Sequence, residues 1–145
     1  MRLALYEPDI PQNTGTMLRL AACLGVGAEV IEPCGFILSD TKLKRAGMDY
    51  LLEAEISRHS SWAAFQAWRA QARQTQGGHR LLLLTTKGDI PYTAFAFAPD
   101  DILMVGRESS SIIIAGTEAT ALRAYSFLPS SGRAATSVGK GSKVS

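Results

Sequence analysis

The sequence has few of the residues that would indicate a secreted, metal-binding or membrane protein. Two cysteines occur in 145 residues, and Cys23 and Cys34 have neither the spacing of metal ligands nor histidines near them. No apolar run is long enough to cross a membrane, and the N-terminus lacks the charged and apolar regions of a signal peptide. We therefore expect a cytoplasmic protein with two reduced thiols, no metal and no membrane contact.

Net charge and nucleotide-binding motifs are also sparse. The formal net charge of +2 is too small to indicate a nucleic-acid-binding protein by itself. The sequence contains no Gly-x-Gly-x-x-Gly fingerprint, no Walker loop and no nucleophile elbow. These absences argue against a Rossmann dinucleotide site and against the common α/β enzyme classes.

The N-terminal stretch predicts the first strand–turn–helix unit of an α/β fold. The apolar run 3–6 predicts a buried strand, which Pro8 and Pro11 prevent from continuing. The spacing of the apolar residues that follow predicts a helix with Asn13 or Thr14 as its N-cap. In such a unit, function is expected at the carboxyl end of the strand.

Strand and helix patterns alternate along the rest of the chain. The expected features are an end of the first helix at Gly25 and Gly27, a strand at 28–31, a short basic helix at 40–45, a short strand segment at 50–56, a helix from 61 to about 74 capped by Ser60 or Ser61, a buried strand at 81–85, a short edge strand at 94–98, a buried strand at 101–105, a strand at 111–115 and a short helix at 117–125. The order predicts one α/β domain over 1–145, with a mostly parallel sheet and flanking helices.

Four ring-bearing side chains near the middle of the chain are assigned to structure rather than to chemistry. His59 follows the segment 50–56, and we expect it in an exposed loop. Trp62, Phe65 and Trp68 recur at helical spacing, which favours a place in the core over a platform for stacking bases.

The start of the first helix is a candidate anion site. The backbone N–H groups of residues 13–17 lie at the predicted helix N-terminus, where they can receive a phosphate. Arg19 follows about one turn later, and its guanidinium could reach back to the same place. The alternative is a well-capped helix with a surface arginine.

A second candidate is the basic cluster of Lys42, Lys44 and Arg45. Such a cluster can contact RNA phosphates, and each contact adds to a salt-dependent affinity. The alternative is a solvated face of a surface helix.

Several blocks of the sequence carry a family resemblance. Tyr-Glu-Pro-x-Ile-Pro-x-Asn-Thr-Gly at 6–15, followed by Leu-Arg-Leu at 18–20, closely resembles the start of SPOUT-superfamily RNA methyltransferases. The nearest branch is the TrmL-type tRNA 2′-O-methyltransferases, which modify the wobble nucleotide. Further matching blocks follow in the family's order at 31–36, 43–50, 84–88 and 101–108.

The resemblance implies a fold, a reaction and a set of site residues. It implies a trefoil knot in the C-terminal part, S-adenosylmethionine as cofactor, the anticodon stem-loop of tRNA as substrate, and a homodimer that completes its RNA site across two subunits. The implied cofactor-binding residues are Leu84, Thr85, Gly106, Glu108, Leu128 and Thr136, the implied catalytic residues are Arg19, Asn13 and Gly15, and the implied RNA-binding residues are Lys42, Lys44 and Arg45.

The implied roles follow from the residue types. A guanidinium resists deprotonation, so Arg19 is better suited to hold the phosphate beside the target ribose than to act as a general base. Gly106 lets the backbone approach a ligand closely because it lacks a Cβ. Glu108 would anchor the loop after Gly106 or pair with an arginine, and a simple surface carboxylate is the alternative.

The segment 109–145 departs from the family pattern and is rich in Ser, Ala, Gly and Thr. Ser111 and Ile113 stand where the family has glycine and proline, and 136–138 stands where the family has Ser-(Leu or Met)-Asn. We treat this segment as a divergent, partly unstructured tail that a shifted reading frame or a truncation would explain. The alternative functions are a catalytically inactive RNA-binding or dimerisation remnant and, more remotely, a small α/β protein that binds an unrelated nucleotide.

Overall fold

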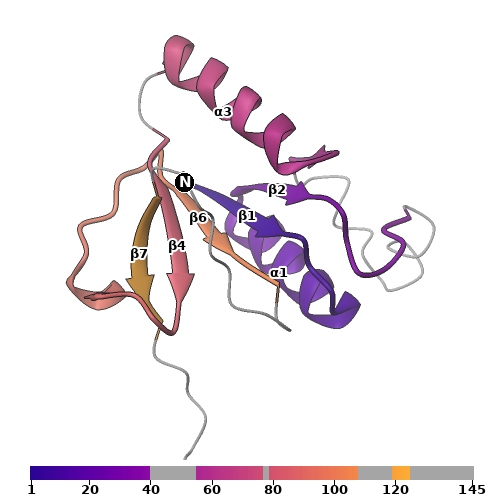
Figure 1. Cartoon of the computed structure of the whole chain (residues 1–145), viewed down its shortest axis with the longest axis horizontal. Coiled ribbons are helices and arrows are strands. Elements are labelled where there is room, and N and C mark those ends of the chain that lie inside the picture. Colours follow the sequence, from indigo (N-terminus) through magenta and orange to yellow (C-terminus); the bar gives the residue numbers. More distant parts are fainter. Residues whose placement is uncertain (40–54, 77–78, 108–118, 125–145) are drawn as a thin grey trace, which may run out of the picture.

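The computed structural model describes residues 1–39, 55–76, 79–107 and 119–124 (Figure 1). In chain order the elements are β1 (Arg2–Tyr6), α1 (Pro11–Leu24), β2 (Gly27–Ile31), β3 (Ile56–His59), α3 (Trp62–Gln76), β4 (Leu81–Thr85), β5 (Ile90–Pro91), the 3₁₀ turn η2 (Tyr92–Ala94), β6 (Ile102–Val105) and β7 (Ala119–Arg123). The predicted basic helix at 40–45, the strand at 111–115, the knot and the end of the tail lie outside these residues.

The described strands form one parallel sheet in the order β3-β2-β1-β6-β4-β7-β5. The strand β1 lies at the centre of the N-terminal half, between β2 and β6, and pairs Leu5 with both Val30 and Val105. Parallel strands need a crossover between them, which α1 and α3 supply. The predicted α/β class with a mostly parallel sheet is confirmed.

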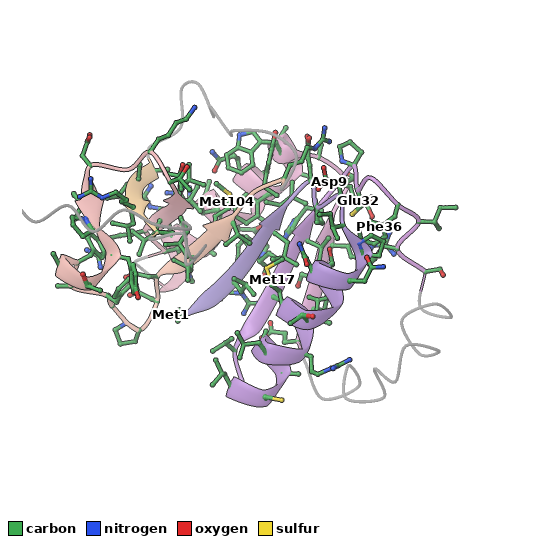
Figure 2. The ribbon with its side chains drawn as sticks, turned by 90° about the horizontal axis from the view of Figure 1, so that it is seen from below. Met1, Asp9, Met17, Glu32, Phe36 and Met104 are labelled. Carbon is green, nitrogen blue, oxygen red and sulfur yellow. The ribbon has the colours of Figure 1, made fainter. Side chains whose placement is uncertain are left out.

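Among the described residues, α1 packs on one face of the sheet and α3 on the other, because successive side chains of a strand point to opposite faces. Leu5 and Val30 belong to a cluster with Leu18 and Ala21 of α1. Ala4, Ile31 and Met104 belong to a second cluster around Phe65 of α3, with Trp62 and Trp68 packed against it. Figure 2 shows Met17 on α1 and Met104 on β6 among these side chains. The assignment of the three aromatic residues of α3 to the core is confirmed.

The helix α1 begins two residues earlier than its predicted cap. Ile10 is the N-cap residue and makes no side-chain cap, while Pro11 takes the first helical position, where a missing N–H costs nothing. Thr14 is buried in the helix, and both its N–H and its hydroxyl donate to the carbonyl of Ile10. The prediction of Asn13 or Thr14 as N-cap is therefore wrong.

The other end of α1 agrees with the prediction. Gly25 adopts a left-handed conformation with φ 63°, and its N–H donates to the carbonyls of Ala21 and Ala22. A residue without Cβ adopts this conformation without strain, which is why helices commonly end at glycine.

Three local predictions are wrong because strand pairing overrides local pattern. The third strand lies at Ile56–His59, so it begins where the expected segment 50–56 ends, since it pairs with β2 and places His59 opposite Ile31. The expected edge strand 94–98 is replaced by the short β5 and the 3₁₀ turn that follows it. The expected helix 117–125 is the strand β7, which pairs with β4 from Leu81 to Thr85.

The expectation of an exposed loop for His59 is also wrong. Its side chain is buried, and its Nε2 lies 2.6 Å from the Glu29 carboxylate on the neighbouring strand. By contrast, Ser61 caps α3 as predicted, because its hydroxyl accepts a 3.1 Å hydrogen bond from the Ala64 N–H.

Candidate functional site

The predicted site residues on the first helix and the sixth strand meet at the carboxyl edge of the sheet. Gly106 directly follows β6, and Asn13 lies in the first turn of α1, which follows β1. Since β1 and β6 are adjacent and parallel, their carboxyl ends lie side by side. Ligands of open α/β sheets bind at this edge.

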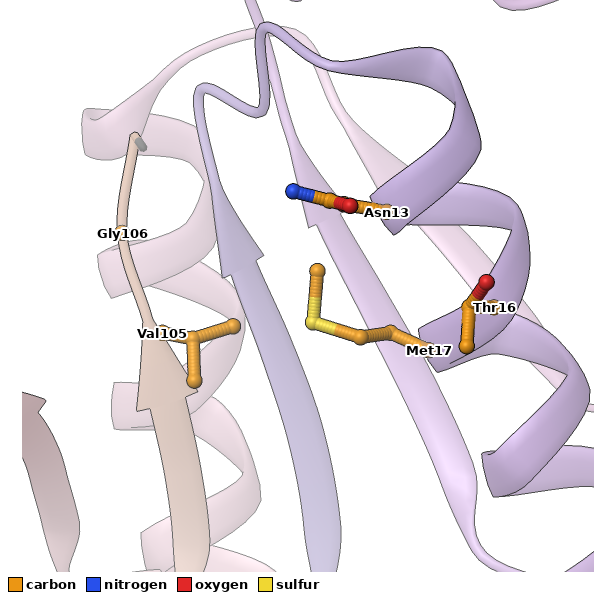
Figure 3. Close-up of a pocket in the computed structure, with 5 residues that line it drawn as sticks. All are labelled: Asn13, Thr16, Met17, Val105 and Gly106. Carbon is orange, nitrogen blue, oxygen red and sulfur yellow. The ribbon is translucent and has the colours of Figure 1, made fainter. Parts of the chain in front are cut away.

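A pocket of about 320 Å³ opens between α1 and the end of β6. Its described lining consists of Asn13, Thr16, Met17, Val105 and Gly106. Figure 3 shows the Asn13 amide and the Met17 side chain pointing from α1 toward β1, with Val105 on β6 beyond it. The structure thus brings together two predicted site residues that lie far apart in the sequence, Asn13 and Gly106.

Gly15 and Arg19 occupy other faces of the same helix. Gly15 is buried against the sheet. Arg19 is exposed, and it lies six positions after Asn13 in the sequence. At about 100° of rotation per residue, Arg19 points about 120° away from Asn13 around the helix axis. The described lining of the pocket does not include Arg19, so its catalytic role stays a prediction.

The N-terminus of α1 offers fewer free donors than the sequence suggested. Pro11 has no N–H, and the Thr14 N–H is already bonded to the Ile10 carbonyl. Residues 15–17 lie within the following turn of the helix, where backbone N–H groups bond to the carbonyl four residues earlier. An anion at this helix start would therefore be met by the N–H groups of Gln12 and Asn13 alone.

Leu84 and Thr85 lie at the same edge, at the end of β4 and beyond β6. Both are half-buried and pair with Leu122 and Arg123 of β7. Neither lines the pocket between α1 and β6. The other predicted site residues, Glu108, Leu128, Thr136, Lys42, Lys44 and Arg45, lie outside the described residues.

The loop after β1 is held by backbone contacts to the loop after β2. The Gly35 N–H donates to the Pro8 carbonyl at 2.9 Å, and a Cβ on Gly35 would lie 2.7 Å from the Asp9 Cβ. Glycine is therefore required for this close approach. Figure 2 shows Asp9 and Phe36 of the two loops close together.

Charged and ionisable side chains surround the carboxyl edge. Arg107 pairs with Glu7, at 3.0 Å between Nη2 and Oε2. Burial, reinforced by the charge and hydrogen bond of Glu7, raises the pKa of the Tyr6 hydroxyl. Burial also raises the pKa of the Cys34 thiol, and the charge of Glu32 raises it further. Both groups are therefore neutral at pH 7.

Sequence reasoning assigned no side-chain role to five residues of this region. These are Glu7, Thr16, Met17, Val105 and Arg107. The sequence carried a signal for two of them, because charged residues at the end of a predicted strand are candidates for a site. Glu7 directly follows the first strand, and Arg107 follows the glycine after the strand 101–105. The signal was insufficient, since the sequence does not say that these two strands are neighbours.

Within the described ranges, His, Cys, Asp and Glu side chains do not gather in threes as metal ligands would. In the same ranges, the helices are too short or too polar to span a bilayer.

The fold and the edge pocket define a parallel α/β protein with a candidate ligand site at the carboxyl ends of its strands. Residues 1–126 match the family model described as the SpoU rRNA Methylase family. The chain belongs to this family, which confirms the predicted resemblance.

Curated relatives from different organisms carry the same protein name. A Beijerinckia indica protein named tRNA (cytidine(34)-2′-O)-methyltransferase is 60% identical over 110 residues, which cover 76% of this chain and 66% of the relative. An Escherichia coli K12 protein of the same name is 38% identical over 112 residues, which cover 77% of this chain and 67% of the relative. The matched part of the chain thus spans about two thirds of these relatives.

Solved structures share the fold. One described as "Structural insights into the 2-OH methylation of C/U34 on tRNA" matches with a TM-score of 0.73 and 33% identity, over 92% of this chain and 83% of that chain. The SpoU methyltransferase AviRb from Streptomyces viridochromogenes in complex with AdoMet matches with a TM-score of 0.73 over 96% of this chain and 54% of that chain. At 20% identity the second likeness concerns the fold alone.

Proposed function

We propose that this chain transfers a methyl group from S-adenosylmethionine to the ribose 2′-hydroxyl of the tRNA wobble nucleotide, cytidine or uridine. The observation that carries the proposal is 60% identity to a relative named for 2′-O-methylation of cytidine 34 in tRNA. The pocket lined by Asn13 and Gly106 supports the proposal, because it lies at the edge of the sheet where a ligand is expected. The substrate would be the anticodon stem-loop, and the reaction would take place in the cytoplasm.

The pocket is chemically suited to part of a nucleoside-like ligand. Its volume of about 320 Å³ is at the lower end of ligand pockets in proteins. Met17 and Val105 offer apolar contact, and the Asn13 amide and Thr16 hydroxyl offer hydrogen bonds. When bound, S-adenosylmethionine supplies an electrophilic methyl group on a sulfonium centre.

The residues of the chain would act mainly by alignment. Gly106 would let backbone groups reach the ligand, and Leu84 and Thr85 would line the cofactor side of the edge. Asn13 would orient a polar group in the pocket, while Gly15 lets α1 lie close to the sheet. The proposal extends to the predicted contacts of Glu108, Leu128 and Thr136 with the cofactor and of Lys42, Lys44 and Arg45 with RNA phosphates.

Arg19 would hold the phosphate beside the target ribose, and a second subunit would complete this site. Arg19 is exposed and is not among the described residues that line the pocket, so we place its contact with RNA on the outer surface of α1. The exposed face of α1 also carries Leu20 and Leu24, which are 56% and 66% exposed. Exposed apolar side chains on one helix face favour an interface, and a C₂ dimer is the commonest form.

Cofactor binding and methyl transfer test the proposal in two steps. Calorimetric titration with S-adenosylmethionine should show saturable binding near the micromolar range, about −8 kcal/mol. Transfer of a labelled methyl group to tRNA should then fall by about 100-fold or more in Arg19→Ala, because a charge-assisted contact in the transition state is lost. S-adenosylmethionine binding by this variant should not change.

The control is Arg73→Ala, which removes an exposed arginine from the last turn of α3. This variant should keep both binding and transfer. A folded protein that gives no heat with S-adenosylmethionine would contradict the enzyme proposal and favour the inactive RNA-binding or dimerisation remnant.

A further inference from the structure

One ion pair connects the two loops that form the walls of the edge pocket. The Arg107 guanidinium donates from Nη2 to the Glu7 carboxylate at 3.0 Å and from Nε to the Glu7 backbone carbonyl at 3.4 Å. The pair joins positions 100 residues apart in the sequence. Both side chains are partly buried, at 34% and 24% exposed. Partial shielding from water makes the interaction stronger than an exposed pair.

Glu7 is held from several sides. Its backbone has φ 44°, a left-handed conformation that costs energy for a residue with a Cβ. Its N–H donates to the Ile31 carbonyl at 2.9 Å, and its carboxylate also accepts a hydrogen bond from the Tyr6 hydroxyl. A strained conformation persists where the surrounding contacts enforce it, and Arg107 supplies two of these contacts.

Glu7 and Arg107 lie next to the two segments that line the pocket. Glu7 is the first residue after β1, where the chain turns toward α1 and the Asn13 turn. Arg107 directly follows Gly106, on the opposite wall. The pairing of the neighbouring strands β1 and β6 ends at Leu5 and Val105. The Glu7–Arg107 contact therefore bridges the loops just where the sheet no longer holds them together.

We infer that Glu7 and Arg107 are positioning residues, which set the spacing between the Gly106 loop and the first turn of α1. This inference rests on the proposed methyl transfer. Neither side chain lines the pocket, so both act through the residues that do. Small misplacement of reacting groups lowers rates steeply, by as much as about 100-fold for about 1 Å. The pair thus controls alignment in the reaction more than affinity for the cofactor.

Glu7→Gln, Arg107→Met and the double variant form a double-mutant cycle. Each single variant should lower kcat for methyl transfer by about 10- to 100-fold. The S-adenosylmethionine dissociation constant and the thermal midpoint should change little. The double variant should be no slower than the slower single variant, because both substitutions remove the same contact. Glu7→Gln keeps the side-chain volume and a hydrogen-bonding group, so it is expected to fold.

The matched control is the exposed pair of Arg58 and Glu32, which joins the ends of β3 and β2. Arg58→Met and Glu32→Gln should leave kcat unchanged. The inference is overturned if the wild type methylates tRNA and the Glu7 and Arg107 variants have the same kcat per folded molecule. It is also overturned if the variants lose activity only to the extent that their thermal midpoints fall. A wild type that neither binds S-adenosylmethionine nor methylates tRNA overturns the proposed function and this inference with it.

Discussion

Glu29 places a carboxylate in the core, where it is fully buried and needs charged or hydrogen-bonding partners. Its oxygens lie 2.6 Å from Arg2 Nε and 2.6 Å from His59 Nε2. Arg2 also contacts Glu55 at 3.1 Å, and its guanidinium lies 5.6 Å from the centre of the Trp68 ring. A buried charge is tolerated when it is paired and hydrogen-bonded in this way. Removing its charge leaves Arg2 without its buried counter-ion.

Glu29→Gln should therefore lower the free energy of unfolding by about 3 kcal/mol, the cost of breaking a buried ion pair from one side. The measurement is urea denaturation, with the change read from the midpoint at an unaltered m-value. The matched control is Glu32→Gln, which breaks the exposed pair with Arg58 and should cost less than about 1 kcal/mol. Equal losses in the two variants would contradict the role assigned to burial.

Among the elements, α3 is specified at its start by a side-chain cap and along its length by aromatic contacts. Ser61 satisfies the Ala64 N–H, which would otherwise lack a partner. Trp62, Phe65 and Trp68 then stack along the helix, with ring centres 5.3 and 5.7 Å apart. Tyr6 of β1 meets Trp62 edge-on at 5.4 Å. The helix thus holds β1 in place from the face opposite to α1.

Ser61→Ala should destabilise the protein by about 1 kcal/mol, because it removes this cap without touching the core. Ser60→Ala is the control, since Ser60 is exposed and precedes the cap by one residue. Thermal or urea unfolding of both variants checks the difference. A loss of similar size in Ser60→Ala would show that the cap is not the cause.

On the scale of the whole molecule, the proposed homodimer explains the exposed apolar face of α1. Leu18 and Ala21 of this helix are buried against the sheet, whereas Leu20 and Leu24 face outward. A face of this kind is stabilised when a second copy covers it. The proposed dimer would also supply the partner surface that Arg19 requires.

Wild-type protein should sediment as a dimer, and the double variant Leu20→Glu/Leu24→Glu should sediment as a monomer, because two charges cannot be buried unpaired in an interface. The monomeric variant should also lose methyl transfer, because the proposed site needs both subunits. Ile90→Glu changes an exposed apolar residue on β5, at the far end of the sheet order, and should stay dimeric. A wild-type protein that sediments as a monomer at tens of micromolar would contradict the proposed dimer.

The candidate site was partly predictable from the sequence. Asn13 and Gly106 belong to contiguous motifs, so the family resemblance identified each of them. Their shared pocket depends on β1 lying beside β6, and no local pattern encodes which strands are neighbours. The separation of Arg19 from Asn13 follows from helical geometry alone. The sequence alone left open whether the long Arg19 side chain reaches the helix start, and the described lining of the pocket does not include it.

The sequence by itself determined the elements whose signals are local: the end of α1 at Gly25, the Ser61 cap and the apolar strand β4. Backbone conformation, capping and short-range periodicity act within a few residues, so they can be read from the chain. The tertiary structure alone decided that 119–123 forms a strand, that His59 is buried beside Glu29, and that Arg107 meets Glu7. Each of these depends on a partner distant in sequence, whose hydrogen bonds and charge outweigh the weak local preference.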